Sequence, residues 1–311
     1  MDISVVIVSW NSKEIVRQCL EAVCNHRSKY RYEIILVDNA STDGTPDMVE
    51  EQFPRVRLIR NSDNLGFSKA NNIGIREGKG RYICLMNSDI VLREHCFDLM
   101  LDYEDRHPDI GILAPKLLYP DLSIQDSCQS FPTLWNNLCE AFALNKMFPR
   151  SSFFSGRHWI YFAHDRICEA PVIPAAFWMV RRAAFDSMGL LDEQFFIYCE
   201  DMDLCKRFWK GGWRVVFYPE AEAIHYHGGS SSNLPARFHL EQQRTALQYW
   251  RKHHGSLGVF GISSVKVLHY LLRLVPNLIF SLISGKNREK RKANIQRATL
   301  SILFYLKIAK P

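Results

Sequence analysis

Residues 5–8 read VVIV, residues 33–37 read EIILV and residues 81–86 read RYICLM. Each is a short and nearly uninterrupted apolar run, which is typical of a strand buried on both faces of a sheet. The stretches between these runs have the polar starts and apolar spacing of helices, at about residues 15–24, 46–53 and 67–77. Strands and helices that alternate at such short intervals predict a doubly wound, mostly parallel α/β sheet.

Acidic and amide side chains follow two of these strands. Asp38 ends the run 33–37, and Asn87-Ser88-Asp89 follows the run 81–86. Ligands of such sheets bind outside the carboxyl ends of the strands. Carboxylates at that edge suit a hard divalent cation that bridges two phosphates. The chain has neither a Gly-x-x-x-x-Gly-Lys-Ser/Thr loop nor a Gly-x-Gly-x-x-Gly turn after its first strand, which disfavours ATPase and dehydrogenase sites.

These residues have two interpretations at this point. Asp38 is suited to accept the ring N–H of a pyrimidine or to bind a ribose hydroxyl, but an aspartate after a strand also caps its own turn. Asp89 is suited to ligate Mg²⁺ or Mn²⁺, with Asn87 on ribose or on a metal-bound water. The segment Asn87-Ser88-Asp89 is equally compatible with a second Asx turn.

The composition is that of a globular protein, with 47% apolar and 23% charged residues in a chain of 311. Nine cysteines show no Cys-x-x-Cys spacing and an odd total, which indicates buried, reduced thiols in a cytosolic compartment. Residues 1–8 lack a basic segment before the apolar run, so we expect a first strand there and no signal peptide.

Basic charge gathers at the end of the chain. From Lys286 onward there are eight lysines and arginines against one acid, a net of +7, whereas residues 1–285 carry 31 against 32, a net of −1. The segment 259–283 is apolar but interrupted by charged residues, and its longest uninterrupted apolar stretch is about half of the roughly 20 residues that span a bilayer. This predicts interfacial helices with a basic patch on an anionic membrane surface. The alternative is a helical hairpin packed on the body of the protein.

The expected domains are therefore 1–255, with a nucleotide-binding half (1–115) and an acceptor half (116–255), and a basic amphipathic tail (256–311). No recognisable module interleaves bases with aromatics, so nucleic acid is not an expected partner.

Several motifs together resemble family 2 glycosyltransferases. Residues 5–11 (VVIVSWN) and 37–44 (VDNASTDG) resemble the opening of that family, and residues 64–74 (NLGFSKANNIG) resemble its rhamnosyltransferase-like branch. The segment 85–89 (LMNSD) stands where these enzymes carry an Asp-x-Asp metal motif, with Asn87 in place of the first aspartate. The acceptor-side signature is matched at 198–204 (YCEDMDL), and the later histidine segment at 225–230 (HYHGGS). The motifs occur in the family's order over residues 3–231.

The resemblance implies a GT-A fold and an inverting, Mg²⁺- or Mn²⁺-dependent transfer. The implied donor is dTDP-rhamnose or a UDP-sugar. The implied acceptor is a cell-envelope polysaccharide or a saccharide linked to polyprenyl diphosphate, at the inner face of the cytoplasmic membrane. The expected donor nucleotide-binding residues are Ser9, Asn11, Asp38, Asn64, Gly66, Lys69, Asn71 and Asn87. The expected metal ligands are Asp89 and His225, the expected catalytic base is Asp201, and the residues expected near the acceptor or supporting the site are Trp178, Glu200, Asp203 and His227.

The role of Asp201 also has a chemical argument. Transfer to an alcohol needs a proton acceptor beside the attacking hydroxyl. In a single displacement that base lies opposite the leaving diphosphate, so it is not a metal ligand. The other interpretation is that Glu200, Asp201 and Asp203 favour a helix N-terminus electrostatically. Likewise, Trp178 in an apolar run fits the core as well as it fits a sugar face.

Two other functions remain compatible with parts of the sequence. A nucleotidyltransferase would need a loop rich in glycine and lysine after the first strand, where this chain has Ser9-Trp10-Asn11-Ser12. A catalytically inactive, sugar-nucleotide-binding or scaffold subunit is favoured by Asn87 and disfavoured by the Glu200-Asp201 pair.

Overall fold

The apolar runs that open the chain form neighbouring strands of one nine-stranded sheet in the computed structural model, which describes residues 1–226, 235–283 and 288–308. By internal contacts the chain forms two compact units, Met1–Ser130 with Ala163–Phe238, and Phe131–Phe162 with His239–Pro311. We refer to these as unit 1 and unit 2. Unit 2 combines an internal segment, Phe131–Phe162, with a C-terminal segment that begins at His239. Our expected boundary lay at 255, and the expected domain division stays a prediction.

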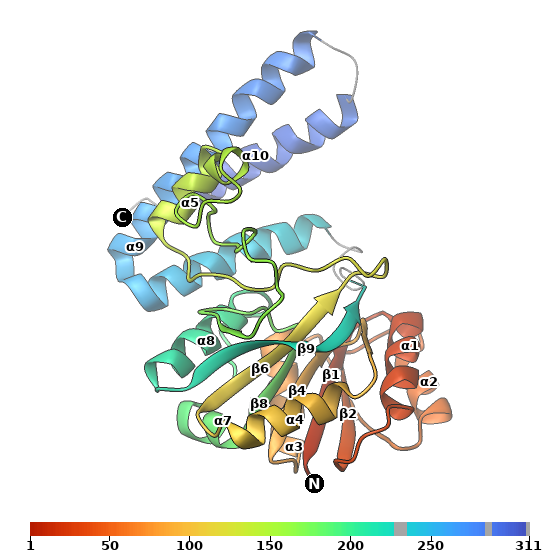
Figure 1. Cartoon of the computed structure of the whole chain (residues 1–311). Coiled ribbons are helices and arrows are strands. Elements are labelled where there is room, and N and C mark those ends of the chain that lie inside the picture. The colour runs from red at the N-terminus through yellow and green to blue at the C-terminus, as the bar shows by residue number, and fades with distance from the viewer. Residues whose placement is uncertain (227–234, 284–287, 309–311) are drawn as a thin grey trace. The chain divides into compact units, whose positions relative to one another are not determined.

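The sheet of unit 1 has the order β3-β2-β1-β4-β8-β6-β9-β5, with β7 also paired to β9 (Figure 1). Strands β1 to β4 are parallel, as the sequence predicts, and Val5 of β1 lies level with Ile34 of β2 and Cys84 of β4. Beyond β4 the sheet is mixed, since β8 is antiparallel to both β4 and β6, while β6 and β9 are parallel. The strand bounds are β1 (Ile3–Ser9), β2 (Tyr32–Asp38), β3 (Val56–Arg60), β4 (Tyr82–Asn87), β5 (Ile90–Leu92), β6 (Ile110–Leu118), β7 (Cys168–Glu169), β8 (Phe177–Arg181) and β9 (Arg214–His225).

Helices cover both faces of this sheet. On one face, buried side chains of α1, α2 and α4, such as Leu20, Met48 and Phe97, form the main core with β1, β2 and β4. On the other face, Ala70 of α3 packs against Ile35 and Val37. This two-sided burial explains why the strands are apolar without alternation. The helices of unit 1 are α1 (Lys13–Cys24), α2 (Thr45–Gln52), α3 (Phe67–Glu77), α4 (Cys96–Arg106), α7 (Arg182–Met188) and α8 (Glu200–Lys210).

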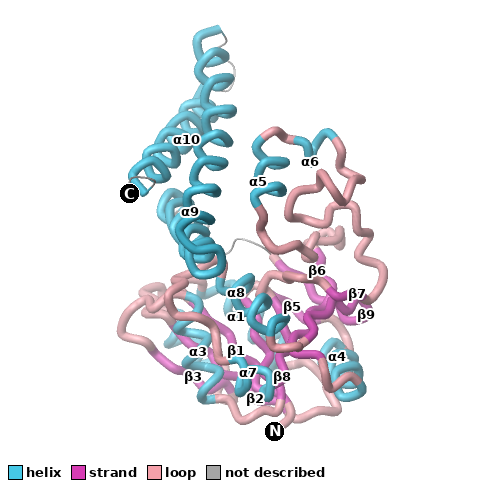
Figure 2. The backbone as a smooth tube through the Cα atoms, turned by 90° about the vertical axis from the view of Figure 1, so that its left-hand side faces the viewer, coloured by secondary structure: helices cyan, strands magenta, loops and turns pink. Residues whose placement is uncertain are grey.

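Unit 2 is helical where it is regular (Figure 2). Its elements are α5 (Leu134–Ala141), α6 (Leu144–Met147), most of α9 (Pro235–Ile283) and α10 (Arg288–Ile308). Helix α9 is broken at Gly255, whose φ of 63° is not helical. Among the described residues, one stretch of helix, Phe238–Ile279, is long and apolar enough by composition to cross a membrane, and 22% of its most apolar window is buried.

One buried carboxyl in unit 1 has no evident polar partner. Glu104 of α4 is fully buried, and neither of its carboxyl oxygens has a hydrogen-bond partner among the described residues. Burial raises the pKa of Glu104 well above its ordinary value, and the nearby Arg181 opposes that rise. The folded protein therefore holds this group more tightly protonated than the unfolded chain does.

We expect the Glu104→Gln variant to be more stable than the wild type at neutral pH. A group whose pKa is raised in the folded state stabilises the fold most at a pH below its unfolded-state pKa of about 4.3. As the pH rises from there to the folded-state pKa, the free energy of unfolding falls by about 1.4 kcal/mol per pH unit. The free energy of unfolding, measured in urea from pH 4 to 8, should thus favour the variant increasingly as pH rises. Exposed Glu94→Gln on the neighbouring loop is the control, and parallel curves for the wild type and Glu104→Gln would contradict the prediction.

Candidate functional site

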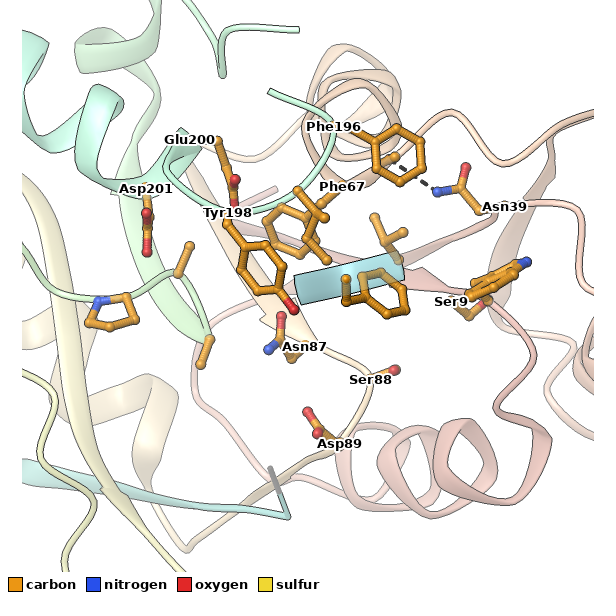
Figure 3. Close-up of a pocket in the computed structure, with 18 of the residues that line it drawn as sticks. Ser9, Asn39, Phe67, Asn87, Ser88, Asp89, Phe196, Tyr198, Glu200 and Asp201 are labelled. Carbon is orange, nitrogen blue, oxygen red and sulfur yellow. Dashed lines mark hydrogen bonds between the residues drawn. The ribbon is translucent and has the colours of Figure 1, made fainter. Parts of the chain in front are cut away.

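A cavity of about 320 Å³ opens in unit 1 beyond the carboxyl ends of β1 and β4 (Figure 3). Its walls come from the loops after these strands, the loop before α3, the segment before β8 and the start of α8. The lining residues are Val8, Ser9, Trp10, Asn39, Asn64, Gly66, Phe67, Asn87, Ser88, Asp89, Pro174, Ala175, Ala176, Phe196, Ile197, Tyr198, Glu200, Asp201, His225 and Phe238. The structure thus brings together eight of the residues expected from the sequence: Ser9, Asn64, Gly66, Asn87, Asp89, Glu200, Asp201 and His225.

Asp38 lies just behind this cavity and ties two loops together. The Ser9 hydroxyl donates to Asp38 Oδ1 at 3.0 Å, and the backbone N–H of Ser41 donates to Oδ2 at 2.8 Å. The second bond is the Asx turn that the sequence left open as an alternative. Asn11 joins the same loops, because its backbone N–H donates to Ser41 Oγ and its Oδ1 accepts from the backbone N–H of Thr42. Asp38 and Asn11 therefore shape the wall behind the cavity lining.

Asn39 braces the opposite edge of the same loop. Its Nδ2 donates to the carbonyl of Gly66 at 3.0 Å, and its Oδ1 accepts from Asn61 Nδ2 at 2.9 Å and from the backbone N–H of Leu65 at 3.3 Å. Asn39 is 3% exposed, so these bonds satisfy a polar group that would otherwise be buried at a cost. They fix the loop 61–66 against the end of β2.

Gly66 is required where this loop turns into α3. Its φ is 83°, and a Cβ there would lie 2.4 Å from the carbonyl oxygen of Phe196. The close approach lets the N–H of Phe67 donate to that carbonyl at 2.6 Å. Asn64 supports the turn, since its Oδ1 accepts from the N–H of Gly66. The contact between Gly66 and Phe196 joins the two loops that carry most of the aromatic lining.

Asp89 and His225 meet at the floor of the cavity. Asp89 Oδ1 lies 3.2 Å from His225 Nε2. Gln125 sets the ring of His225, because its Nε2 donates to the His225 carbonyl at 2.7 Å and its Oε1 lies 2.9 Å from Nδ1. That amide orientation places the imidazole proton on Nδ1, and Nε2 then directs a lone pair toward a carboxylate. The contact between this lone pair and the Asp89 carboxylate is favourable when a cation binds between the two groups or when Nε2 also carries a proton.

The pair fits a divalent cation that takes its other ligands from a diphosphate and water. Mg²⁺ and Mn²⁺ are commonly held by one or two carboxylates plus substrate phosphates, and neutral imidazole is also a ligand for transition metals. Within residues 1–226, 235–283 and 288–308, no group of three or more histidine, cysteine, aspartate or glutamate side chains is arranged to hold a metal. His227, which we expected near the acceptor or in support of the site, lies outside the described residues.

Glu200 and Asp201 begin α8 at another wall of the cavity (Figure 3). Glu200 is 5% exposed, and its Oε2 has no hydrogen-bond partner among the described residues. Burial, reinforced by the charge of Asp201, raises the pKa of Glu200 well above its ordinary value. Asp201 is half-buried, and its Oδ1 accepts from the backbone N–H of Met202 at 2.7 Å. Burial thus favours the protonated form of Glu200, next to the half-buried Asp201.

The approach to α8 is strained. Tyr198 and Cys199 have φ of 70° and 69°, a conformation that is costly for residues with a Cβ. Arg207 holds the preceding loop, since it donates to the carbonyls of Met188, Gly189 and Leu190. Phe196 and Tyr198 in this segment line the cavity. Residues in strained backbone conformations are often found at functional sites.

Besides Asp38 and Asn11, four of the expected residues do not line the cavity. Lys69 is exposed on α3, and Asn71 donates to the carbonyl of Phe67 in its own helix at 2.9 Å. Trp178 is fully buried in β8 next to Leu85 of β4, so the structure places it in the core and not against an acceptor. Asp203 is fully buried and forms an ion pair with Arg207 at 2.8 Å, so it anchors the loop before α8.

Several lining residues were missed by the sequence analysis. Trp10 and Asn39 directly follow Ser9 and Asp38, which we expected to bind the nucleotide, so their position in the sequence could have identified them. Gln125 is separated from His225 by a hundred residues, and only the pairing of β6 with β9 brings its segment there. Tyr198 opens the motif at 198–204, but the positive φ at this residue is not readable from its residue type. Phe196 lies just before that motif and was not singled out.

The sequence model described as Glycosyl transferase family 2 matches residues 4–189, which is more than half of the chain. The chain belongs to this glycosyltransferase family. The match covers β1 to β4, Asp89 and β8, and so confirms the resemblance that the motifs predicted. This family 2 glycosyltransferase has Asp201 and His225 outside the matched range.

Its relatives agree with that assignment. The N-acetylglucosaminyl-diphospho-decaprenol L-rhamnosyltransferase of Mycobacterium tuberculosis (strain ATCC 25618 / H37Rv) is 32% identical over 218 residues, which cover 65% of this chain and 69% of the relative. The glycosyltransferase GlyG of Streptococcus pneumoniae serotype 4 is 31% identical over 114 residues, or 35% of this chain and 38% of that one.

Solved structures confirm the GT-A fold. The mannosyltransferase PcManGT from Pyrobaculum calidifontis, in complex with GDP-Man and Mn²⁺, has a TM-score of 0.58 at 14% identity, covering 97% of this chain and 87% of that one. GalNAc-T7 with UDP, GalNAc and Mn²⁺ also has a TM-score of 0.58 at 14% identity, covering 100% of this chain and 58% of that one. At this identity the likeness concerns the fold.

We expect Gly66→Ala to destabilise unit 1 more than Gly212→Ala. Both glycines have φ of 83°, but a Cβ at Gly212 would meet nothing within 4 Å, whereas at Gly66 it would collide with Phe196. The backbone conformation alone costs about 1–2 kcal/mol, and the forced separation at Gly66 adds about 1–3 kcal/mol. Urea unfolding of the two variants measures the difference, and equal losses would show that the contact between Gly66 and Phe196 is not required.

Proposed function

We propose that this glycosyltransferase is a metal-dependent, inverting enzyme that moves a sugar from a nucleoside-diphosphate donor onto a lipid-linked saccharide. The observation that carries the proposal is that Asp89, His225 and Asp201 line one cavity. Figure 3 shows Asp89 and Asp201 in it. Asp89 and His225 supply a cation site at one wall. Asp201 presents a carboxylate at another, with Tyr198 and Asn87 between them in the view.

A divalent cation bound by Asp89 and His225 would supply Lewis-acid stabilisation of the charge on the leaving diphosphate. Two of the GT-A structures similar to this chain, PcManGT and GalNAc-T7, were solved with Mn²⁺, which supports the same class of ion here. Asn87 stands where a second carboxylate would add charge. Its amide instead presents both a donor and an acceptor to the ribose or to a metal-bound water.

Asp201 acts as the general base in this proposal. As the acceptor oxygen attacks the anomeric carbon, its O–H proton passes to the Asp201 carboxylate, while the bond from the anomeric carbon to the diphosphate breaks. Attack from the side opposite the leaving group inverts the anomeric configuration. Burial raises the pKa of Glu200, which favours its protonated form and so reduces the negative charge beside Asp201.

The donor and acceptor are proposed from the relative. The name of the mycobacterial protein specifies L-rhamnosyl transfer to N-acetylglucosaminyl-diphospho-decaprenol. We propose dTDP-rhamnose as donor, with UDP-sugars as the next candidates, and a saccharide carried on polyprenyl diphosphate as acceptor in cell-envelope polysaccharide assembly. Such an acceptor is held in a bilayer, so the enzyme would work from the cytoplasm, peripherally, at the inner face of the cytoplasmic membrane. The basic charge at the end of the chain supports contact with anionic lipid.

We expect Gln125→Leu to weaken Mn²⁺ binding about 10- to 100-fold, because residues that orient a metal-binding histidine affect affinity by that factor. Titration calorimetry of Mn²⁺ in the presence of UDP measures the effect without any turnover. Gln129→Leu is the matched control, since Gln129 is buried nearby and pairs through its backbone with Val172. Equal affinities for wild type and Gln125→Leu would argue against a metal at His225.

A further prediction concerns Glu200 and Asp201 at the start of α8. Nucleotide release from a panel of dTDP- and UDP-sugars, with membrane lipid extract as acceptor and with Mn²⁺ or EDTA, should fall about 10²- to 10⁴-fold in Asp201→Asn. Glu200→Gln should stay within a few fold of the wild type, because an amide replaces a neutral acid. Exposed Asp186→Asn on α7 is the control for surface charge.

The outcomes of that experiment separate the alternatives. Loss in Glu200→Gln with activity retained in Asp201→Asn would transfer the role of base to Glu200. If no donor releases nucleotide while the wild type binds free dTDP or UDP in calorimetry, the chain is an inactive nucleotide-sugar-binding or scaffold subunit. Release that persists in EDTA would remove the metal from the proposal.

A further inference from the structure

The segment 131–162 leaves unit 1 between β6 and β7 and exposes an unusual number of large apolar side chains. Met147 is 65% exposed, Phe153 63%, Phe142 50%, Phe148 46% and Trp135 43%. A water-soluble surface rarely gathers so many large apolar groups in about thirty residues. We call this segment, Phe131–Phe162, the aromatic insertion.

The exposed aromatics of the insertion are ordered against one another. The rings of Trp135 and Phe153 lie 4.9 Å apart, those of Phe153 and Phe154 5.0 Å, and those of Phe148 and Phe154 5.1 Å. Trp135 Nε1 donates to the carbonyl of Phe153 at 3.0 Å, which pins the indole to the loop. These contacts make a preformed apolar surface, so little conformational entropy remains to be lost when it is covered.

Helix α9 holds the insertion in place. Arg273 donates to the carbonyls of Glu140 and Ala141 at 3.0 and 3.3 Å, at the end of α5. Gly261 lies so close to Leu134 of α5 that a Cβ there would be 3.1 Å from a Leu134 methyl group. A guanidinium satisfies carbonyls that the helix end leaves without partners. The insertion and α9 are therefore parts of one structural unit, although about a hundred residues separate them in the sequence.

The helices of unit 2 add further exposed apolar groups. Leu257 is 88% exposed and Phe260 62% on α9, and Leu303 is 51% exposed on α10. Helix α10 is fixed to α9 by polar contacts inside the unit, because His239 Nε2 lies 3.0 Å from Ser301 Oγ and Tyr305 donates to Gln243. The same unit thus presents apolar surface from both of its chain segments.

Charge is divided between the units more sharply than along the sequence. Unit 2 contains 16 lysines and arginines against 3 acids, a net of +13. Unit 1 contains the remaining 23 against 30, a net of −7. The insertion contributes to this excess, with Lys146, Arg150 and Arg157 against Glu140. Basic charge combined with exposed Trp, Phe and Leu is the composition of surfaces that bind anionic membranes.

We propose that the aromatic insertion and the C-terminal helices form a single membrane-docking unit, in which the insertion enters the interface of an anionic bilayer. The predicted basic tail is then one part of the surface, and residues 131–162 are its second, apolar part. A second copy of the chain is a poor occupant of this surface, because two units of +13 repel each other. Docking concerns residues outside the cavity and does not depend on the sugar transferred.

The test is sedimentation of the full-length protein with phosphatidylcholine vesicles, with and without phosphatidylglycerol. The double variant Met147→Ser/Phe153→Ser should bind the anionic vesicles at least tenfold more weakly than the wild type, with an unchanged melting temperature. Leu122→Ser is the matched control, since Leu122 is 55% exposed in unit 1, and it should bind as the wild type does. A triple variant, Lys290→Gln/Arg291→Gln/Lys292→Gln, should lose the preference for anionic over neutral vesicles.

Each contrary outcome is distinct. Wild-type binding by the Met147→Ser/Phe153→Ser variant would overturn the role of the insertion and leave only the tail. Equal binding of wild type to neutral and anionic vesicles would overturn the electrostatic part. Self-association of the wild type in analytical ultracentrifugation, abolished by the same double variant and without vesicle binding, would show that a second copy covers this surface. Donor hydrolysis with a soluble acceptor, measured alongside, reports on the proposed transferase independently.

Discussion

Two buried side chains at the end of β2, Asp38 and Asn39, hold the loops from which the cavity is built. Asp38 accepts hydrogen bonds from the Ser9 hydroxyl at the end of β1 and from the backbone of Ser41 after β2. Asn39 donates to Gly66 and accepts from Leu65 in the loop before α3. Both are nearly inaccessible to water, so each missing bond would leave a buried polar group unsatisfied at about 1–3 kcal/mol. The rest of the site depends on these hydrogen bonds, because they fix the loop 61–66 in which Gly66 contacts Phe196.

The acids of α8 show how one short sequence divides its tasks by burial. Asp203 is paired with Arg207 and anchors a loop. Glu200 is buried and its pKa is raised by that burial, and Asp201 reaches the cavity. The helix N-terminus favours negative charge at all three positions. The helix terminus therefore does not distinguish the proposed base, Asp201, from its neighbours, and the burial and partners of each side chain do.

The sequence predicted most of what depends on local pattern. The parallel strands β1 to β4, helix α3 and the meeting of Asp89 with His225 all follow from apolar runs and ordered motifs. It predicted less where tertiary contacts decide, as in the burial of Trp178 and Asp203 and in the bond between Asn71 and its own helix. The aromatic insertion was left unassigned, because its aromatics pack on one another and on a helix a hundred residues away without any period.

The difference in net charge between the two units determines which of them an anionic membrane surface attracts. Near an anionic leaflet, unit 2 at +13 is attracted while unit 1 at −7 is repelled, and both forces act within a Debye length of about 8 Å at physiological ionic strength. Attraction brings unit 2 to the surface first, and the short-range apolar contacts of Phe153 and Met147 then act at contact distance. The same leaflet repels the acidic unit that carries the cavity. The acceptor proposed above is held in that leaflet, so electrostatic attraction of unit 2 would bring enzyme and acceptor to one face of the bilayer.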